Sequence, residues 1–291
     1  MTQPAMEVGV IGLGLMGRAI ASRLIQAGFE VIGYDLEENA RNNAASLGVN
    51  VQVDARSIAV KARMIILSLL TSDNRRDLLW GAQSLANALQ PGTVILDTTT
   101  GRPEDIEQDS RRLASMGIKL VDVCLSGSSQ VMAEGRALAL IGDRKEDADY
   151  RDVIEALSKA QYYFQTPGQG NRVKLIVNLV FGLNRLVLAE ALGLAERAGF
   201  DLNAILDILK SGETYSVVMD TKGPKMIAGV YEPALARLAQ HAKDVHLILD
   251  YARQLGASVP VTETHARIID ALVREGCGDL DNAAIFKAYH S

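Results

Sequence analysis

The first half of the chain alternates short apolar runs with stretches whose apolar residues recur every three or four positions. The apolar runs, which are typical of buried strands, lie at 7–11, 30–34, 64–69, 93–97, 119–123 and 137–141. Helical patterns lie between the early ones, at 17–27, 40–47 and 73–81. Strands that alternate with helices form βαβ units, so we expect a mostly parallel, doubly wound sheet.

The pattern changes after the turn-forming segment Thr166-Pro167-Gly168-Gln169-Gly170. No strand pattern follows it, and long helical patterns cover 171–198, 202–211, 215–228, 233–254, 260–275 and 282–289. The sequence therefore predicts two domains, an α/β domain over residues 1–166 and an all-α domain over 167–291.

Composition excludes several classes of function. The chain has 30 Lys and Arg residues and 35 Asp and Glu residues, and these charges do not cluster in blocks of one sign. It therefore lacks the basic stripe that nucleic-acid binding needs. Two widely separated cysteines, Cys124 and Cys277, favour neither a disulfide framework nor a metal cluster. Residues 1–6 lack a signal-peptide pattern, and charged residues interrupt the apolar stretch 175–200. We expect a cytoplasmic protein with no metal and no membrane span.

A glycine turn links the first apolar run to the first helical pattern. Its sequence is Gly12-Leu13-Gly14-Leu15-Met16-Gly17. In such a turn the first glycine permits the tight bend, the second lets a pyrophosphate approach the backbone, and the third lets the helix pack on the strand. The helix N-terminus supplies N–H groups and a positive dipole end for phosphates. The turn predicts a dinucleotide site within residues 1–166.

Asp35 follows the second apolar run, 18 residues after Gly17. A carboxylate at this place can accept hydrogen bonds from both ribose hydroxyls of NAD, and it repels the 2′-phosphate of NADP. Leu36, Glu37 and Glu38 come next, with no arginine among them. We therefore expect NAD, with NADP the less favoured cofactor.

Four blocks in this order resemble the β-hydroxyacid dehydrogenases, the family that contains 3-hydroxyisobutyrate dehydrogenase and tartronate semialdehyde reductase. They are the glycine turn, the segment 122–129 (Asp-Val-Cys-Leu-Ser-Gly-Ser-Ser), the segment 168–178 and the pair Lys243-Asp244. The resemblance covers nearly the whole chain. It implies a Rossmann-type domain followed by a helical domain for substrate binding and oligomerisation, and hydride transfer between a nicotinamide cofactor and a small β-hydroxyacid or its semialdehyde.

The resemblance also implies roles for individual residues. Lys174 matches the catalytic lysine of the family, and Asn178 matches the asparagine that helps to hold the substrate. Ser126, Gly127 and Ser128 match the loop that receives the substrate carboxylate. The positions that match residues near the cofactor are Leu69, Leu70, Thr99 and Lys243.

The chemistry of a lysine agrees with this role. Oxidation of an alcohol removes the hydroxyl proton while hydride leaves, and an amine can take that proton or return it. A free lysine titrates near pH 10.4, so a lysine base needs a lowered pKa, whereas reduction needs only the protonated form. Lys174 and Asn178 are four residues apart and share one helix face. They can therefore grip the same substrate oxygen.

Several residues depart from the family pattern. Cys124-Leu125 replaces Pro-Val, Ser128 replaces a second glycine, and Val177 replaces the first of two asparagines. These changes surround the carboxylate-binding loop, so the resemblance does not identify the substrate. Two alternatives remain, a non-catalytic dinucleotide-binding module of the same fold and an imine reductase. Lys174 favours alcohol chemistry over both.

The apolar helix predicted at 171–198 points to self-association. Its relatives use this helix to form dimers or tetramers, and Gly182 and Gly193 are expected to permit close helix approach. We expect a homodimer or homotetramer.

Overall fold

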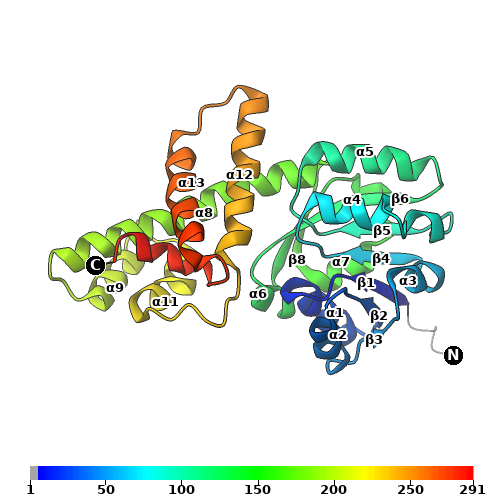
Figure 1. Cartoon of the computed structure of the whole chain (residues 1–291), viewed down its shortest axis with the longest axis horizontal. Helices are drawn as coiled ribbons and strands as arrows, with labels where there is room; N and C mark the ends of the chain where they lie inside the picture. Colours follow the sequence, from blue (N-terminus) through cyan, green and yellow to red (C-terminus); the bar gives the residue numbers. More distant parts are fainter. Residues whose placement is uncertain (1–5, 291) are drawn as a thin grey trace. The chain divides into compact units, whose positions relative to one another are not determined.

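The computed structural model describes residues 6–290. These residues form two compact units, and the boundary between them in the chain lies between Lys174 and Leu175. Unit 1 is an α/β domain, and unit 2 is helical (Figure 1). Both fold-class predictions are confirmed. The boundary between the contact-defined units falls inside one long helix, α8 (Gln169–Arg197), so this helix contributes to both units.

Unit 1 contains one eight-stranded sheet with the strand order β3-β2-β1-β4-β5-β6-β7-β8. The strands are β1 (Glu7–Ile11), β2 (Glu30–Tyr34), β3 (Asn50–Val51), β4 (Met64–Leu67), β5 (Val94–Asp97), β6 (Lys119–Ser126), β7 (Ala137–Ile141) and β8 (Ser158–Tyr163). All neighbouring strands are parallel except β6 and β7. The order reverses between β1 and β4, the type of position where doubly wound sheets bind ligands.

Helices cover both faces of the sheet because its central strands are apolar on both sides. On one face Val8 and Val10 pack with α1 (Leu15–Gln26) and α7 (Arg151–Leu157), and α6 (Ser129–Ala133) packs against α1. On the other face Ile65 and Ile95 pack with α3 (Ala55–Lys61), α4 (Ser72–Trp80) and α5 (Pro103–Ala114). Unit 1 also contains α2 (Glu38–Ala45) and the short 3-10 helices η1 (Ala86–Ala88) and η2 (Lys145–Asp147).

Two strands were missed by the apolar pattern. β3 has only two residues, and β8 is largely polar, so neither produces a run of apolar positions. β8 forms because it pairs with β7. β6 also extends three residues beyond the expected end at 123, because Cys124, Leu125 and Ser126 pair with β7.

Unit 2 consists of helices around a single apolar core. They are the remainder of α8, α9 (Leu202–Ser211), α10 (Val217–Thr221), α11 (Gly223–Ala228), α12 (Leu238–Leu255), α13 (Pro260–Leu272), the π-helical turn η3 (Val273–Cys277) and the 3-10 helix η4 (Asn282–Ala288). The helix expected at 215–228 is two helices, since Pro224 lies at the start of α11. The helix expected from 233 begins only at Leu238, because residues 236–238 pair instead with the segment near Asp281.

Helix α8 is the one helix among residues 6–290 that is long and apolar enough to cross a membrane by length and composition, although 39% of its most apolar window is buried inside the protein. The packing of this helix shows what approaches Gly182 and Gly193 within the chain. A Cβ at Gly182 would meet the ring of His241, and one at Gly193 would meet Tyr289. Both glycines therefore permit close packing within the chain.

Candidate functional site

The glycine turn lies at the carboxyl end of β1. Gly12 has a φ of +92°, and a Cβ there would lie 2.3 Å from the Ser68 carbonyl oxygen. A Cβ at Gly17 would lie 1.8 Å from the Gly12 carbonyl oxygen, whereas one at Gly14 would meet nothing within 4 Å. The first and last glycines are thus required by the protein's own backbone. Gly14 is exposed and leaves an open approach to the N-terminus of α1, a geometry that fits a pyrophosphate.

The other residues of the turn differ in exposure. Leu13 is buried in the core below the turn, Met16 is half-buried and Leu15 is exposed. The first turn of α1 carries no acidic side chain. Its electrostatics therefore favour a negatively charged ligand.

Asp35 is brought directly against the glycine turn. One carboxylate oxygen accepts the Leu13 N–H at 2.6 Å, and the other accepts the Glu37 N–H at 2.9 Å. The structure also adds a residue that the sequence analysis missed. The Arg41 guanidinium donates to the backbone oxygens of Asp35 and Leu36 at 2.7 and 2.8 Å. Its position, one turn into a helix that starts just after Asp35, is the signal that could have identified it.

Leu69 and Thr99 are brought together at the ends of β4 and β5. The Leu69 N–H donates to the Thr99 hydroxyl at 3.3 Å, and the Thr99 N–H donates to Asp97 at 3.0 Å. Leu70 follows and is 65% exposed. Thr99 itself is buried, so its hydroxyl shapes the turn around Leu69.

A buried ion network adjoins the contact between Leu69 and Thr99. Arg75 is fully buried and binds Asp97 at 2.8 Å and Asp109 at 3.0 Å. Asp109 also accepts the indole N–H of Trp80 at 2.8 Å. Sequence reasoning missed Arg75 because residues 72–77 of the surrounding helix are all polar, so the pattern does not indicate a buried arginine. The network holds the carboxylate that orients Thr99.

The predicted substrate loop begins at the last residue of β6, Ser126. Gly127 has a φ of +152°, and a Cβ there would lie 2.7 Å from Val131. The Ser128 hydroxyl caps α6 by accepting the Val131 N–H at 3.3 Å. The serine that replaces a glycine of the family therefore has a local structural role in starting this helix.

Lys174 reaches the same loop from α8. Its side chain is buried, and Nζ donates to the Leu125 carbonyl oxygen at 2.8 Å. Leu125 immediately precedes Ser126, so the structure brings together the predicted catalytic lysine and the predicted carboxylate loop. Both belong to unit 1.

The start of α8 is anchored by Asp122, which the sequence analysis used only as part of a motif. Its carboxylate accepts the backbone N–H groups of Gly168 and Asn171, each at 2.8 Å. The Asn171 side chain in turn accepts the Gly101 N–H at 2.8 Å. Burial raises the pKa of the Asp122 carboxyl, and these backbone N–H bonds oppose that effect. Asp122 thus ties the strand that ends in Ser126 to the helix that carries Lys174.

Asn178 and the Lys243-Asp244 pair come together in unit 2. The Asn178 amide nitrogen donates to Asp244 at 3.0 Å, and Lys243 forms an ion pair with the other oxygen of Asp244 at 3.0 Å. Asn178 lies one helical turn after Lys174 on α8. Asp244 therefore fixes the orientation of the Asn178 amide.

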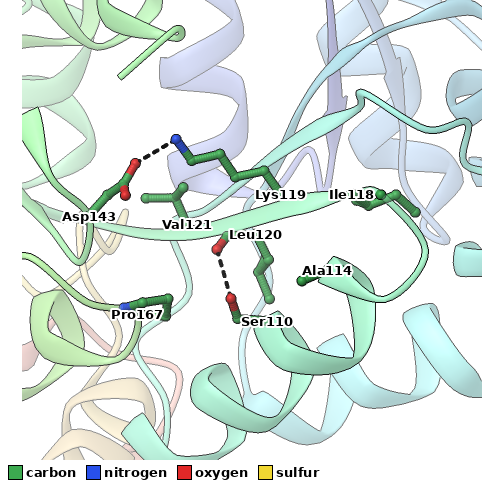
Figure 2. A pocket seen from close by; sticks show the side chains of 9 residues that line it. Ser110, Ala114, Ile118, Lys119, Leu120, Val121, Asp143 and Pro167 are labelled. Atoms are coloured by element: carbon green, nitrogen blue, oxygen red, sulfur yellow. Dashed lines mark hydrogen bonds and ion pairs between the residues drawn. The ribbon is translucent and has the colours of Figure 1, made fainter. Parts of the chain in front are cut away.

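A separate hollow of about 300 Å³ lies between α5, β6 and the segments around Asp143 and Pro167 (Figure 2). The side chains of Lys119 and Asp143 form an ion pair of 2.8 Å at its edge. It contains none of the residues predicted to bind cofactor or substrate, and its charged groups are already paired.

Comparison with known proteins places this geometry in context. Residues 7–166 match the family described as the NAD binding domain of 6-phosphogluconate dehydrogenase. Residues 168–289 match the family described as the NAD-binding domain of NADP-dependent 3-hydroxyisobutyrate dehydrogenase. The two matches follow one another along almost the whole chain.

Individual relatives have the same extent. L-threonate dehydrogenase from Cupriavidus necator is 28% identical and covers 97% of this chain and 96% of its own length. Glyoxylate/succinic semialdehyde reductase 1 from Arabidopsis thaliana is 26% identical, with coverage of 97% and 98%. The crystal structure of 3-hydroxyisobutyrate dehydrogenase from Salmonella typhimurium superposes with a TM-score of 0.89 at 24% identity, covering 97% of this chain and 99% of its own.

Proposed function

The chain belongs to the β-hydroxyacid dehydrogenase family of NAD(P)-dependent oxidoreductases, and from this we propose catalytic and substrate-binding roles for individual residues. Lys174 is the general acid and base for a small β-hydroxyacid or its semialdehyde. The observation that carries this proposal is the 2.8 Å bond from Lys174 Nζ to Leu125, which holds the amine beside Ser126.

The proposed residues carry out proton transfer and substrate binding. In oxidation, the lysine amine takes the hydroxyl proton of the substrate; in reduction, the ammonium returns it to the carbonyl oxygen. A nicotinamide cofactor bound at the glycine turn would accept or supply the hydride. Ser126, Gly127 and Ser128 receive the substrate carboxylate, and the Asn178 amide oxygen adds a contact to the substrate. Fixing the carboxylate orients the reacting carbon, which is the main contribution of such a loop to the rate.

We propose NAD as the preferred cofactor. The Asp35 carboxylate, held by the Leu13 N–H, stands where the ribose hydroxyls bind in this kind of turn. Arg41 is the feature that favours NADP instead, since its guanidinium lies at the backbone of Asp35 and Leu36. Both of these hydrogen bonds go to backbone oxygens, so Arg41 does not neutralise the Asp35 carboxylate through a direct bond.

A substrate panel tests both proposals together. We expect oxidation of C3 to C6 β-hydroxyacids, including L-threonate and 3-hydroxyisobutyrate, or reduction of the corresponding semialdehydes, with kcat/KM at least about tenfold higher with NAD(H) than with NADP(H). Initial rates at 340 nm measure both. An NADP preference would overturn the role of Asp35. Tight NADH binding without turnover of any member would favour the non-catalytic module instead.

We also propose a homodimer or homotetramer that uses an exposed face of α8. Four large apolar side chains on this helix are exposed by half or more and recur with a helical period: Ile176, Val180, Val187 and Leu194. This row is too apolar for a helix that faces water along its length. The presence of only two cysteines, Cys124 and Cys277, both free, supports a reducing, cytoplasmic location.

Light scattering tests the assembly. The wild-type chain is expected to have at least twice the mass of one protomer at micromolar concentration. Val187→Asp places a charge in the row and should lower the mass, whereas Leu255→Asp, at an exposed apolar position on α12, should not. A monomeric wild-type chain contradicts the proposal.

A further inference from the structure

Helix α8 carries a second buried cation, Arg185, far from the chemistry of Lys174. Its side chain is completely buried in the helical unit. All three guanidinium nitrogens lack a hydrogen-bond partner among the described residues. A guanidinium has five N–H donors, and burying it without partners is costly. Such a group needs an explanation of its own.

Two buried histidines converge on the same stretch of α8. His241 on α12 and His265 on α13 have ring centroids 5.1 Å apart, and neither Nε2 has a hydrogen-bond partner among the described residues. Gly182 lies one turn before Arg185. A Cβ at Gly182 would lie 2.9 Å from Nε2 of His241 and 3.1 Å from Cε1 of His265. Both rings therefore face the turn of α8 that also carries Arg185.

The two imidazoles are neutral at neutral pH. Burial, and next the charge of Arg185, holds the pKa of His241 well below its ordinary value. The same two causes lower the pKa of His265 to about 4. A neutral imidazole with its proton on Nε2 is a hydrogen-bond donor. The cluster therefore offers N–H donors from three side chains at the same stretch of α8.

The two carboxylates whose charges act on Arg185 are already engaged. Asp281 binds Lys222 at 2.7 Å and Lys225 at 3.3 Å. Asp244 binds Asn178 and Lys243. Burial lowers the pKa of Arg185 to about 10, so it stays charged at neutral pH. The helical unit thus holds four cations near two carboxylates, and Arg185 is the cation without a direct ion pair among the described residues.

We propose that the helical unit binds a small monovalent anion, of halide size, between the Arg185 guanidinium and the Nε2–H groups of His241 and His265. An anion matches this cluster better than water does, because it accepts hydrogen bonds from several donors at once and also neutralises the charge. This site is separate from the proposed cofactor and substrate residues, and its role is to stabilise the helical core.

Bromide is the direct probe, because its anomalous scattering locates it. Crystals of the wild-type protein grown in sodium bromide are expected to show an anomalous peak within hydrogen-bond distance of the Arg185 guanidinium and at least one of the two imidazoles. The absence of a peak there, with ordered water in its place or with the side chains packed together, overturns the proposal. This measurement needs no variant.

Thermal unfolding supplies the second test. Replacing sodium gluconate with sodium chloride at constant ionic strength is expected to raise the Tm of the wild type by roughly 3 °C or more. Arg185→Met should abolish the chloride dependence, whereas Arg197→Met, at an exposed arginine on the same helix, should retain it. An equal chloride response in all three proteins contradicts a specific site.

Discussion

Replacing Lys174 with methionine is expected to lower kcat by about a thousandfold in both directions, which is within the range for loss of a general acid or base. That factor corresponds to about 4 kcal/mol of transition-state stabilisation. Methionine keeps most of the buried volume but has no titratable group. Because Lys174 binds Leu125 beside the predicted substrate loop, the affinity for NADH should stay within about twofold. Steady-state rates and NADH fluorescence titration measure the two effects.

Two further variants identify the cause of this loss. Lys174→Arg keeps the positive charge but cannot exchange a proton near neutral pH, so it should be nearly as inactive as the methionine variant. Lys159→Met removes an exposed lysine of β8 and should retain wild-type kcat. Substantial activity in Lys174→Arg would mean that Lys174 acts through its charge and not through proton transfer. Full activity in Lys174→Met would remove it from the mechanism.

Replacing Asp122 with asparagine is expected to lower kcat by about tenfold or more, although Asp122 is a positioning residue and touches no reacting atom. Its two oxygens hold the Gly168 and Asn171 N–H groups at the start of α8. An asparagine offers one acceptor oxygen and turns an NH₂ group toward the remaining donor. Leaving such a buried donor unpaired costs about 1–3 kcal/mol. The first turn of α8 should shift, and Lys174 should move with it.

Kinetics separate this positioning role from a general loss of stability. The Asp122→Asn variant should lose kcat at a temperature where denaturant titration shows it folded, with NADH affinity unchanged. The matched control is Asp77→Asn, at an exposed aspartate of α4 in the same unit. If the folded Asp122→Asn enzyme has wild-type kcat, the anchor at the start of α8 does not position Lys174.

Periodicity predicted the fold class because its signal is repeated many times along the chain. Six strands were identified from their apolar runs, and the long helix α8 was placed within two residues at its start and one at its end. β8 was missed because it is held by pairing with β7 and not by apolar residues of its own. The start of α12 was misplaced because contacts with the segment near Asp281 override the local helical pattern.

Only part of the candidate site could be predicted from the sequence. The glycine turn, Asp35, Ser126 and Lys174 could be identified because each belongs to a local motif or a family pattern. Arg75 and the anchoring role of Asp122 could not, since each acts through residues that are distant in the sequence. Composition does not distinguish a buried arginine from a solvated one.

The sequence by itself determined the architecture and the nucleotide-binding turn, because these depend on periodicity and on a short motif, and its family resemblance supplied Lys174 as the candidate proton-transfer residue. Only the tertiary structure decided which groups hold them in place. Lys174 meets Leu125, and Asp122 meets the start of α8, across 49 residues or fewer of intervening chain. The Arg185 cluster likewise exists only because three helices place donors from separate segments in one core. Contacts of this kind depend on packing, which no single stretch of sequence encodes.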